Sequence, residues 1–300
     1  MRGSLPRAAT LFEKLPRALR RHRLMTAWMR LTGENPLQLV RIRGRSFGYA
    51  DLNDGFLRLI VIEGDFEHDF FRIADALLAR GGVFVDVGAN HGLLSFGLAE
   101  AHRATAQFHL FEPNSRLVES ILATRALYPA MNMVVNAAAV SDTAGTVSFL
   151  MNPDQTGSSH IVKVGGTPVP AVRLDDYLSE RGIPGVALLK IDVEGYEMAV
   201  LAGANANLEA HRVQAIYFEY FEKYLTRGGG SASLLALLAS LDYQVCFCRQ
   251  HDLRSRGGGS HTIREGLPGH GLPLLPAAGQ VMPPMTDLLA VPRENLVTSA

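Results

Sequence analysis

Val83-Phe-Val-Asp-Val-Gly-Ala-Asn-His-Gly92 is the stretch that decides the fold of this chain. Its apolar run, interrupted only by Asp86, indicates a buried strand, and Gly88 then breaks that strand into a tight turn. A parallel α/β sheet uses such a strand and turn to hold a ligand at the carboxyl end of its first strand. We therefore expect a parallel sheet with a ligand site directly after Val87.

The glycine spacing of this turn indicates the class of ligand. A dinucleotide fingerprint, G-x-G-x-x-G, needs a second glycine that lets the backbone approach a pyrophosphate. Here three other residues separate Gly88 from Gly92, so that second close approach is missing. The Asp86 carboxylate can attract an ammonium group, and the turn therefore suits a zwitterionic amino-acid ligand such as S-adenosylmethionine.

Strands and helices alternate along most of the chain. The expected elements, in chain order, are strands 38–42 and 56–62, helix 68–80, strand 83–87, helix 93–101, strand 108–111, helix 115–128 with Asn114 as its N-cap, strand 133–136, a hairpin of 138–140 with 146–151, strand 169–172, a short helix from 175 or 176, strand 187–191, helix 197–202, strand 213–220, helix 231–241, and strands 243–248 and 287–291. Because no repeat of 20–50 residues accompanies this alternation, it predicts one doubly wound, Rossmann-like α/β domain with helices on both faces of its sheet.

The domain organisation follows from composition. Residues 1–45 form a basic, partly helical N-terminal extension, and residues 46–300 form the α/β domain, with its core motifs in 83–220. A Gly/Pro-rich stretch at about 251–284 is expected to be a long surface loop.

Composition also limits the location. No apolar run reaches the roughly 18–20 residues that cross a bilayer, and the first residues do not resemble a signal peptide. The two cysteines, Cys246 and Cys248, stand two apart in an apolar run, where a strand holds them too rigidly for an easy disulfide. We expect them to be buried and reduced in a cytoplasmic protein.

The N-terminal extension carries an excess of positive charge. Residues 1–45 contain eleven Lys or Arg and two Glu, a net charge of +9 in a chain that is neutral overall. Apolar residues recur among the arginines at near-helical spacing, which suits an amphipathic helix on an anionic membrane at the inner surface, or docked to a partner. The alternative is a helix that covers the domain and exposes its arginines to water. Nucleic acid is not expected as a partner, because stacking aromatics and recognised binding motifs are lacking.

Two further strand ends carry polar residues. Glu112 lies 24 residues beyond Gly88, close to the spacing at which an acid reaches a ribose in this architecture. The alternative is that Glu112 caps the helix that begins near Asn114. At the end of the next strand, Asn136 and Ala137 are placed to meet the adenine edge, although a plain strand terminus explains them nearly as well.

The most unusual polar cluster follows the fourth strand. Lys190, Asp192 and Glu194 alternate, and three charges at the end of a buried strand are costly unless they pair or bind something. A local ion pair of Lys190 with Glu194 is the alternative. Glu219, at the end of the fifth strand, points to the same rim or is a satisfied structural acid. Two or three carboxylates are fewer ligands than a divalent metal ion usually has, so we predict no metal site.

Five motifs occur in a fixed order along residues 55–245. They are Phe84-Val-Asp-Val-Gly-Ala-Asn-His-Gly92, Phe111-Glu-Pro-Asn114, Ala139-Val-Ser-Asp142 with Gly145, Arg173-Leu-Asp-Asp176, and Leu189-Lys-Ile-Asp-Val-Glu-Gly-Tyr-Glu197 with Leu201-Ala-Gly203. In this order they resemble the FkbM family of S-adenosylmethionine-dependent methyltransferases. His91 departs from the family, which often has an aliphatic residue at that position.

The resemblance implies a seven-strand Rossmann-like methyltransferase sheet and methyl transfer from S-adenosyl-L-methionine to a hydroxyl oxygen, with S-adenosyl-L-homocysteine as product. The acceptor would be a small molecule or a glycan with a free hydroxyl, usually a sugar or natural product. The implied roles are Asp86 and Gly88 for the methionine part, Glu112 for the ribose, and Asp192 with Glu194 for the rim around the methyl group. The predicted cofactor contacts also include Asn90 and Gly92 of the same turn, and Asn136 and Ala137 by their position alone.

A hydroxyl nucleophile needs its proton removed, and a positioned base contributes about 10²–10⁴-fold. The hypothesis is that Asp192 or Glu194 is this base, while Lys190 or His160, in the loop Gly157-Ser-Ser-His160, orients the acceptor. Two alternatives stay open: a non-catalytic methyltransferase-like module that scaffolds glycan or natural-product enzymes, and an NAD-dependent sugar oxidoreductase, against which the missing G-x-G-x-x-G argues.

Overall fold

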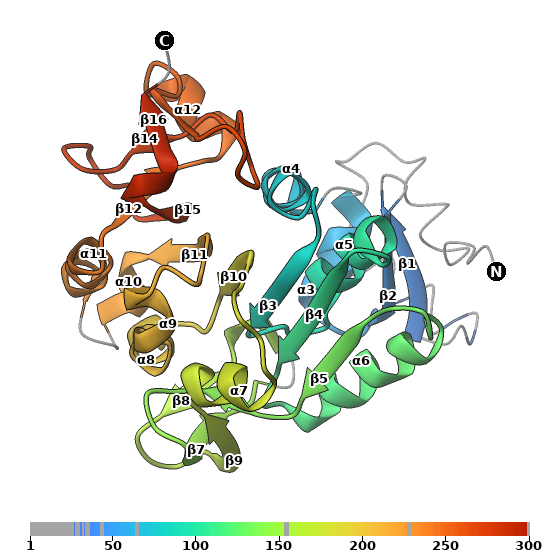
Figure 1. Cartoon of the computed structure of the whole chain (residues 1–300). Helices are drawn as coiled ribbons and strands as arrows, with labels where there is room; N and C mark the ends of the chain where they lie inside the picture. Colours follow the sequence, from blue (N-terminus) through green and yellow to red (C-terminus); the bar gives the residue numbers. More distant parts are fainter. Residues whose placement is uncertain are drawn as a thin grey trace.

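The computed structural model describes residues 37–42, 45–63, 66–152, 156–226 and 230–298, together with residues 27, 31 and 33. Its main sheet crosses the molecule from the C-terminal part to the edge strand beside α6 (Ser115–Ala126) (Figure 1). The strands in spatial order are β14 (Leu275–Pro276), β12 (Tyr243–Phe247), β15 (Met285–Pro292), β11 (Ile216–Phe221), β10 (Leu188–Ile191), β3 (Gly82–Val87), β4 (Ala106–Phe111) and β5 (Met133–Asn136).

The strand directions confirm the predicted doubly wound fold. Strands β5, β4, β3, β10 and β11 pair in parallel, and β15 runs antiparallel between β11 and β12. The short β14, which adds two residues to the edge of β12, extends the expected seven strands to eight. Because these five strands run in the same direction, their carboxyl ends lie together at one edge of the sheet, where such folds bind ligands.

Helices cover both faces of this sheet. One face packs against α4 (His68–Leu77), α5 (Leu93–His102) and α6, and the other against α7 (Leu174–Glu180), α8 (Glu197–Gly203), α9 (Asn205–Glu209) and α11 (Ser231–Ser240). Asn114 caps α6 as predicted, because its side-chain oxygen accepts from the amide of Arg116 at 3.1 Å.

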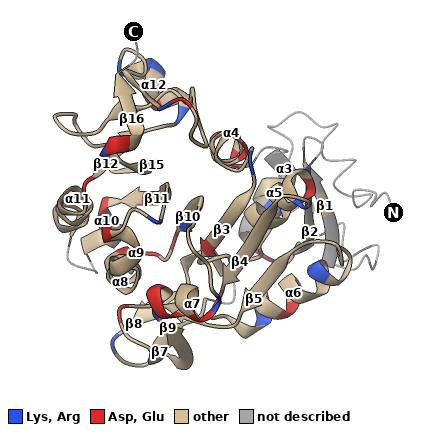
Figure 2. Cartoon of the chain, in the orientation of Figure 1, with Lys and Arg blue, Asp and Glu red and all other residues tan. Residues whose placement is uncertain are grey.

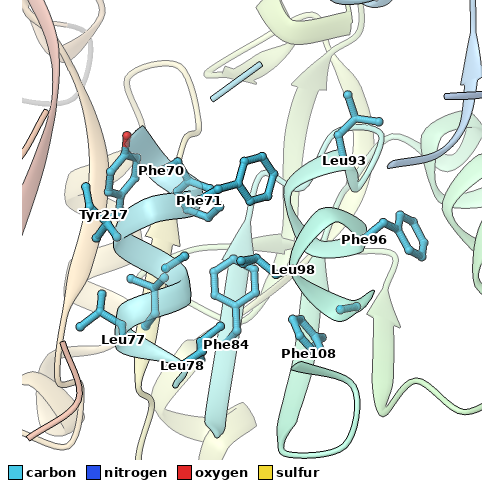
Figure 3. Packing of buried hydrophobic residues seen from close by; sticks show 14 of the residues in the cluster. Phe70, Phe71, Leu77, Leu78, Phe84, Leu93, Phe96, Leu98, Phe108 and Tyr217 are labelled. Carbon is cyan, nitrogen blue, oxygen red and sulfur yellow. The ribbon is translucent and has the colours of Figure 1, made fainter. Parts of the chain in front are cut away.

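The side chains of β3 divide between these two faces. Phe84 belongs to one hydrophobic cluster, while Val83, Val85 and Val87 belong to the other. Figure 3 shows Phe70 and Phe71 of α4 and Leu98 of α5 on the same side of the sheet as Phe84 and Phe108. The Phe84 and Phe108 rings pack edge-on with centroids 6.0 Å apart, an arrangement that contributes about 0.5–1.5 kcal/mol beyond the buried area. Burial on both faces thus fixes β3, and the turn that follows it, in the centre of the molecule.

A second sheet lies at the carboxyl ends of the parallel strands (Figure 1). Its strands in spatial order are β6 (Ala139–Val140), β9 (Thr167–Val172), β7 (Gly145–Leu150) and β8 (His160–Val162). The predicted hairpin of 138–140 with 146–151 is therefore wrong, since β6 and β7 flank β9 and do not pair with each other. The turn residues were assigned correctly, but the partner strand comes from about 30 residues further along the chain, where local spacing gives no signal.

The prediction of a strand at 56–62 is also wrong, because these residues lie in α3 (Gly55–Glu63). Asp54 begins this helix: its Oδ1 accepts from the amide of Leu57 at 3.2 Å. An apolar run of this length has no clear period, so the capping residue decides between strand and helix. The predicted strand at 38–42 is confirmed as β1 (Leu37–Ile42), and its partner is β2 (Arg45–Asp51), which packs on α5 and α6.

The Gly/Pro-rich stretch at 251–284 is not a plain surface loop. It contains part of α12 (Gln250–Ser255), the strand β13 (His261–Ile263), which pairs with β16 (Leu296–Thr298), and the edge strand β14. Leu272 and Leu274 are buried in the core that also holds α4. Cys246 and Cys248 are buried and free, as predicted.

Charge lies mainly outside the sheet: in Figure 2 few ribbon segments of the central strands have the colours of charged residues. Most of the basic extension, with its predicted amphipathic helix, lies outside the described residues. In the part of the chain that the structure describes, no helix combines the length and apolar character that a membrane span requires.

Candidate active site

A cavity of about 820 Å³ opens between the carboxyl ends of the parallel strands and the second sheet. Its floor is formed by the ends of β3, β4, β10 and β11, and its opposite wall by β6, β7 and β8. Gly55, Arg58 and Leu59 of α3 close one side. This size is within the range of roughly 300–1,000 Å³ for small-molecule and cofactor sites.

The turn after β3 requires glycine at its first position. Gly88 has a φ of +77°, and a Cβ on it would lie 1.9 Å from the carbonyl oxygen of Asp192. The turn after β3 and the turn after β10 therefore touch backbone to backbone at the cavity, which both Gly88 and Asn90 line. Gly92 has a different place: it opens α5 with a φ of +71° and packs against Phe96 and Ile121, away from the cavity lining.

Asp86 and Lys190 form a buried ion pair beneath this turn. Their side chains are 3.2 Å apart and both almost fully buried, and the Asp86 carboxylate also accepts from the Ser95 hydroxyl at 2.7 Å. The Lys190 ammonium donates to the carbonyl oxygen of Gly88 at 2.8 Å and pairs with Asp192 at 3.5 Å. Burial alone would lower the pKa of Lys190, but the charges of Asp86 and Asp192 outweigh it and raise the pKa above its ordinary value.

This pair changes the interpretation of two predicted site residues. Asp86 was predicted to attract the ammonium group of a ligand, yet it does not line the cavity and has a cation from the chain itself beside it. Lys190 was predicted to orient an acceptor, yet it is buried behind Gly88 and holds the turn in place. Lys190 pairs with Asp86 and Asp192, not with Glu194 as the local alternative required.

Glu112 lines the cavity at the end of β4. Its two carboxylate oxygens accept from the amides of Asn90 and Asn114, each at 2.8 Å. Burial raises the pKa of Glu112 to about 7, although these two hydrogen bonds oppose the shift. The helix has its own cap in Asn114, so the capping alternative does not explain Glu112. Each oxygen retains a further lone pair with which to accept from a ligand hydroxyl.

Three acids meet at the ends of β10 and β11. Asp192, Glu194 and Glu219 line the cavity, and one carboxylate oxygen of each lies within 4.8 Å of the others. Glu194 has a φ of +57°, so the chain leaves strand geometry before it, and the face that Lys190 and Glu194 were expected to share does not form. The spacing of the three oxygens would admit a divalent cation, and the expectation of a metal-free site stays a prediction.

Burial and neighbouring charges change the acidity of this cluster. The pKa of Glu219 is raised to about 8, first by burial and then by the negative charges of Asp192, Glu194 and Asp287. Asp192 differs from Glu219 because it has Lys190 as an ion-pair partner.

Three of the predicted contacts lie away from the cavity. The Asn136 side chain donates to the carbonyl of Leu110 and to the Tyr177 hydroxyl, and Ala137 is exposed. Ala138–Val140, the next residues along the chain, line the cavity in their place. His160 is in β8 with its Nδ1 3.0 Å from the Ser158 carbonyl, and it is not among the lining residues. A direct contact of Asn136, Ala137 or His160 with a ligand is therefore not favoured.

Sequence reasoning placed the loop 157–160 at the site through His160, but it did not identify Thr156. The Thr156 hydroxyl donates to Asp54 at 2.9 Å and to Asn90 at 3.3 Å, and it lies 3.3 Å from Nε2 of His91. These contacts join α3, the turn after β3 and the second sheet around the cavity. The polar loop was visible in the sequence, but its partners come from 65 to 102 residues away.

Comparison with known proteins identifies the family. A family model described as the methyltransferase FkbM domain matches residues 86–245, more than half of the chain, including the ends of β3, β4 and β10 and all of β11. The chain belongs to the FkbM methyltransferase family. This confirms the resemblance seen in the sequence motifs, while the boundaries predicted for the extension and the domain stay a prediction.

Two curated members are similar in sequence. The 2-O-methyltransferase NoeI of Sinorhizobium fredii is 29% identical over 187 residues, which cover 56% of this chain and 75% of NoeI. The 31-O-demethyl-FK506 methyltransferase FkbM of Streptomyces tacrolimicus is 30% identical over 159 residues, which cover 42% of this chain and 60% of FkbM. A solved structure of methyltransferase FkbM from Methylobacillus flagellatus is 18% identical with a TM-score of 0.39, and the match covers 55% of this chain and 39% of that one.

Proposed function

We propose that this methyltransferase uses S-adenosyl-L-methionine and transfers its methyl group to a hydroxyl oxygen of a small-molecule or glycan acceptor. The observation that carries the proposal is the cavity, in which a glycine turn and a buried acid stand at neighbouring strand ends. The similarity to NoeI, a 2-O-methyltransferase, and to FkbM, a 31-O-demethyl-FK506 methyltransferase, supports the choice of oxygen as the methylated atom.

The residues present fit the cofactor. Gly88 leaves its side of the cavity without a side chain, and Asn90 adds a polar group next to it. Glu112 offers two oxygens with free lone pairs, which matches the two adjacent hydroxyls of a ribose. Bound there, the cofactor would supply an electrophilic methyl group on a positively charged sulfur.

The chain itself has to position the acceptor and accept its proton. Rate in an in-line displacement comes mainly from holding the reacting atoms in line, and the rigid contact between Gly88 and Asp192 provides a fixed wall for this purpose. Of the acids predicted as the base, Asp192 and Glu194 both line the cavity. The acceptor side is bounded by Arg58, Leu59 and the turn that begins at Thr156.

Incubation with radiolabelled S-adenosyl-L-methionine and fractionated cell extract tests the proposal. We expect label in an acceptor that resists mild base, as a methyl ether does, and no labelling with Glu112→Gln at the same protein concentration. Label in a base-labile ester, or in an amine, would contradict O-methylation. Calorimetry with S-adenosyl-L-homocysteine on the folded protein checks cofactor binding independently of the acceptor.

The same material separates the alternatives. A scaffold module would bind partner proteins without dependence on the cofactor and would label nothing. An NAD-dependent oxidoreductase would be stabilised against thermal unfolding by NAD and not by S-adenosyl-L-homocysteine. Cytoplasmic residence, and contact of the basic extension with an anionic membrane or a partner protein, are further proposals; co-sedimentation with anionic lipid vesicles, with and without residues 1–26, tests the membrane contact.

A further inference from the structure

Glu219 differs from the other acids at the strand ends in having no partner of its own. Asp86 and Asp192 share Lys190, and Glu112 accepts from two backbone amides. Among the described residues, none forms a hydrogen bond or an ion pair with the Glu219 carboxylate, which lines the cavity from the end of β11. It is therefore held in place by its strand but is chemically available to whatever occupies the cavity.

The surroundings of Glu219 are predominantly acidic. The charged groups that raise its pKa are Asp192 and Glu194 after β10, Asp287 opposite it in β15, and Glu197 at the start of α8. Of the described cations, Lys190 pairs with Asp86 and Asp192, and Arg249 of the segment after β12 pairs with Asp287. Glu67, before α4, adds a further carboxylate to the cavity wall.

We propose that Glu219 is the catalytic base of the methyl transfer, accepting the proton of the acceptor hydroxyl from its place beside Asp192 and Glu194. The inference rests on the proposed function. In the step, an oxygen–carbon bond forms while the carbon–sulfur bond breaks and leaves its electron pair on sulfur. The hydroxyl proton passes to the Glu219 carboxylate. A sulfonium cation and a carboxylate anion are consumed together, so that the net charge of the site does not change.

The electrostatics make Glu219 responsive to the charge of the cofactor. In the protein alone its pKa of about 8 keeps it mostly protonated at pH 7. A positive charge within a few ångströms lowers the pKa of a carboxyl group, because it stabilises the ionised form. The sulfonium form of the cofactor thus produces the anionic base, whereas the neutral thioether product leaves the proton in place.

Asp192 is less suited to the role, although it is close by. Its carboxylate is already paired with the Lys190 ammonium at 3.5 Å, whereas Glu219 has no such partner among the described residues. A general base works best when its pKa is close to the operating pH, and an acid raised by burial and by like charges meets this condition.

Proton release on ligand binding tests the inference without knowledge of the acceptor. Calorimetric titrations of S-adenosyl-L-methionine and S-adenosyl-L-homocysteine at pH 7, in buffers with different heats of ionisation, give the number of protons exchanged with each ligand. We expect the methionine form to release about 0.5 or more protons beyond the homocysteine form. Glu219→Gln should abolish this difference, while Glu180→Gln, at an exposed position on α7, should retain it.

Several outcomes would overturn the inference and leave the proposed function intact. Equal proton counts for the two ligands in the wild-type protein would do so, as would a difference that Glu219→Gln preserves. Stabilisation of the wild-type protein by magnesium, lost in Glu219→Gln, would show that the cluster holds a cation instead. Failure of both ligands to bind the folded protein would contradict the proposed function itself.

A neighbouring substitution keeps the test available should Glu219→Gln fold poorly. Glu194→Gln removes one of the charges that hold the proton on Glu219. The pH of maximal proton release should then move down, by about 0.5–1 unit, and an unchanged optimum would count against Glu219 as the group that ionises. Once the acceptor is known, Glu219→Gln should lower kcat about 10²–10⁴-fold with little change in KM for the cofactor.

Discussion

The acids in the two halves of the cavity floor have different surroundings. At the ends of β3 and β4, the chain itself supplies partners: Lys190 and Ser95 for Asp86, and two backbone amides for Glu112. At the ends of β10 and β11, Asp192, Glu194 and Glu219 instead face one another across less than 5 Å. Asp192 shares Lys190 with Asp86, whereas Glu219 has no hydrogen-bond or ion-pair partner among the described residues.

This difference suggests two roles: the acids at the ends of β3 and β4 suit ligand recognition, and those at the ends of β10 and β11 suit proton transfer. Carboxylates with fixed donors keep their position, which suits recognition of hydroxyls that do not change during a reaction. Like charges in a buried cluster keep one proton in balance between several groups, which suits proton transfer. Four sets of substitutions, in order of expected effect, test this division.

The largest effect is expected from Lys190→Met. Removal of the ammonium leaves the buried Asp86 without its cation, and breaking one side of a buried ion pair costs about 3–5 kcal/mol of unfolding free energy. Urea unfolding of this variant, next to Lys163→Met at an exposed position, measures the cost. An equal urea midpoint for the two variants would show that the Asp86–Lys190 ion pair does not stabilise the cavity floor at β3.

Gly88→Ala should be the next most damaging. A Cβ would lie 1.9 Å from the Asp192 carbonyl in addition to the strain of a φ of +77°, and the two effects together cost about 2–4 kcal/mol. Gly182→Ala is the matched control, because Gly182 has a φ of +62° and nothing within 4 Å of an added Cβ. The difference between the two variants in thermal unfolding isolates the close approach, and similar losses would mean that the two turns do not touch.

Glu112→Gln should weaken binding of the cofactor and leave the stability of the fold unchanged. Loss of a charged acceptor costs about 1.5–3 kcal/mol of binding, which is about 10–150-fold in Kd for S-adenosyl-L-homocysteine. Calorimetry measures this, and Glu119→Gln on the exposed side of α6 should bind as the wild type does. If Glu112→Gln binds S-adenosyl-L-homocysteine as tightly as the wild type does, Glu112 does not recognise the cofactor.

Glu219→Gln should change the free energy of unfolding in the opposite direction, making the fold more stable at high pH. With a folded-state pKa of about 8 against an ordinary 4.5, the folded protein binds more protons than the unfolded chain between these values, so stability decreases as pH rises through this range. Glutamine cannot ionise, so it removes the loss of stability that ionisation of Glu219 causes. The gain in Tm should be near zero at pH 4.5, should increase as pH rises, and should level off above pH 8. A gain that does not depend on pH would contradict the raised pKa.

The sequence predicted the alternating part of the fold well. β3, α5, β4, α6, β5, β10, α8, α11 and β12 all lie where the apolar runs and caps placed them, within a few residues. These elements depend on neighbours in the chain: Asn114 caps its own helix, and Gly81 with Gly82 follows the end of α4. Local signals are sufficient in these cases because the deciding contact is itself local.

The incorrect predictions have a common physical cause. The apolar run 56–62 has no clear period, and the predicted hairpin ignored β9, a partner 27 to 33 residues beyond β6. In the site, Lys190 was predicted to orient the acceptor, whereas it is buried and paired with Asp86, which is 104 residues away. Charges that are paired over such distances cannot be recognised from spacing along one strand.

The sequence alone determined the family, the order of the strands along the chain and the acids that end them. Those follow from residues whose chemistry acts over a few positions, such as a glycine that turns the chain or an apolar run that becomes a strand. Only the tertiary structure decided which acids are neutralised and which face each other, because Lys190 reaches two of them and leaves Glu219 among like charges. The acidity of a group depends on the charges around it in space, and folding brings those charges from five different elements.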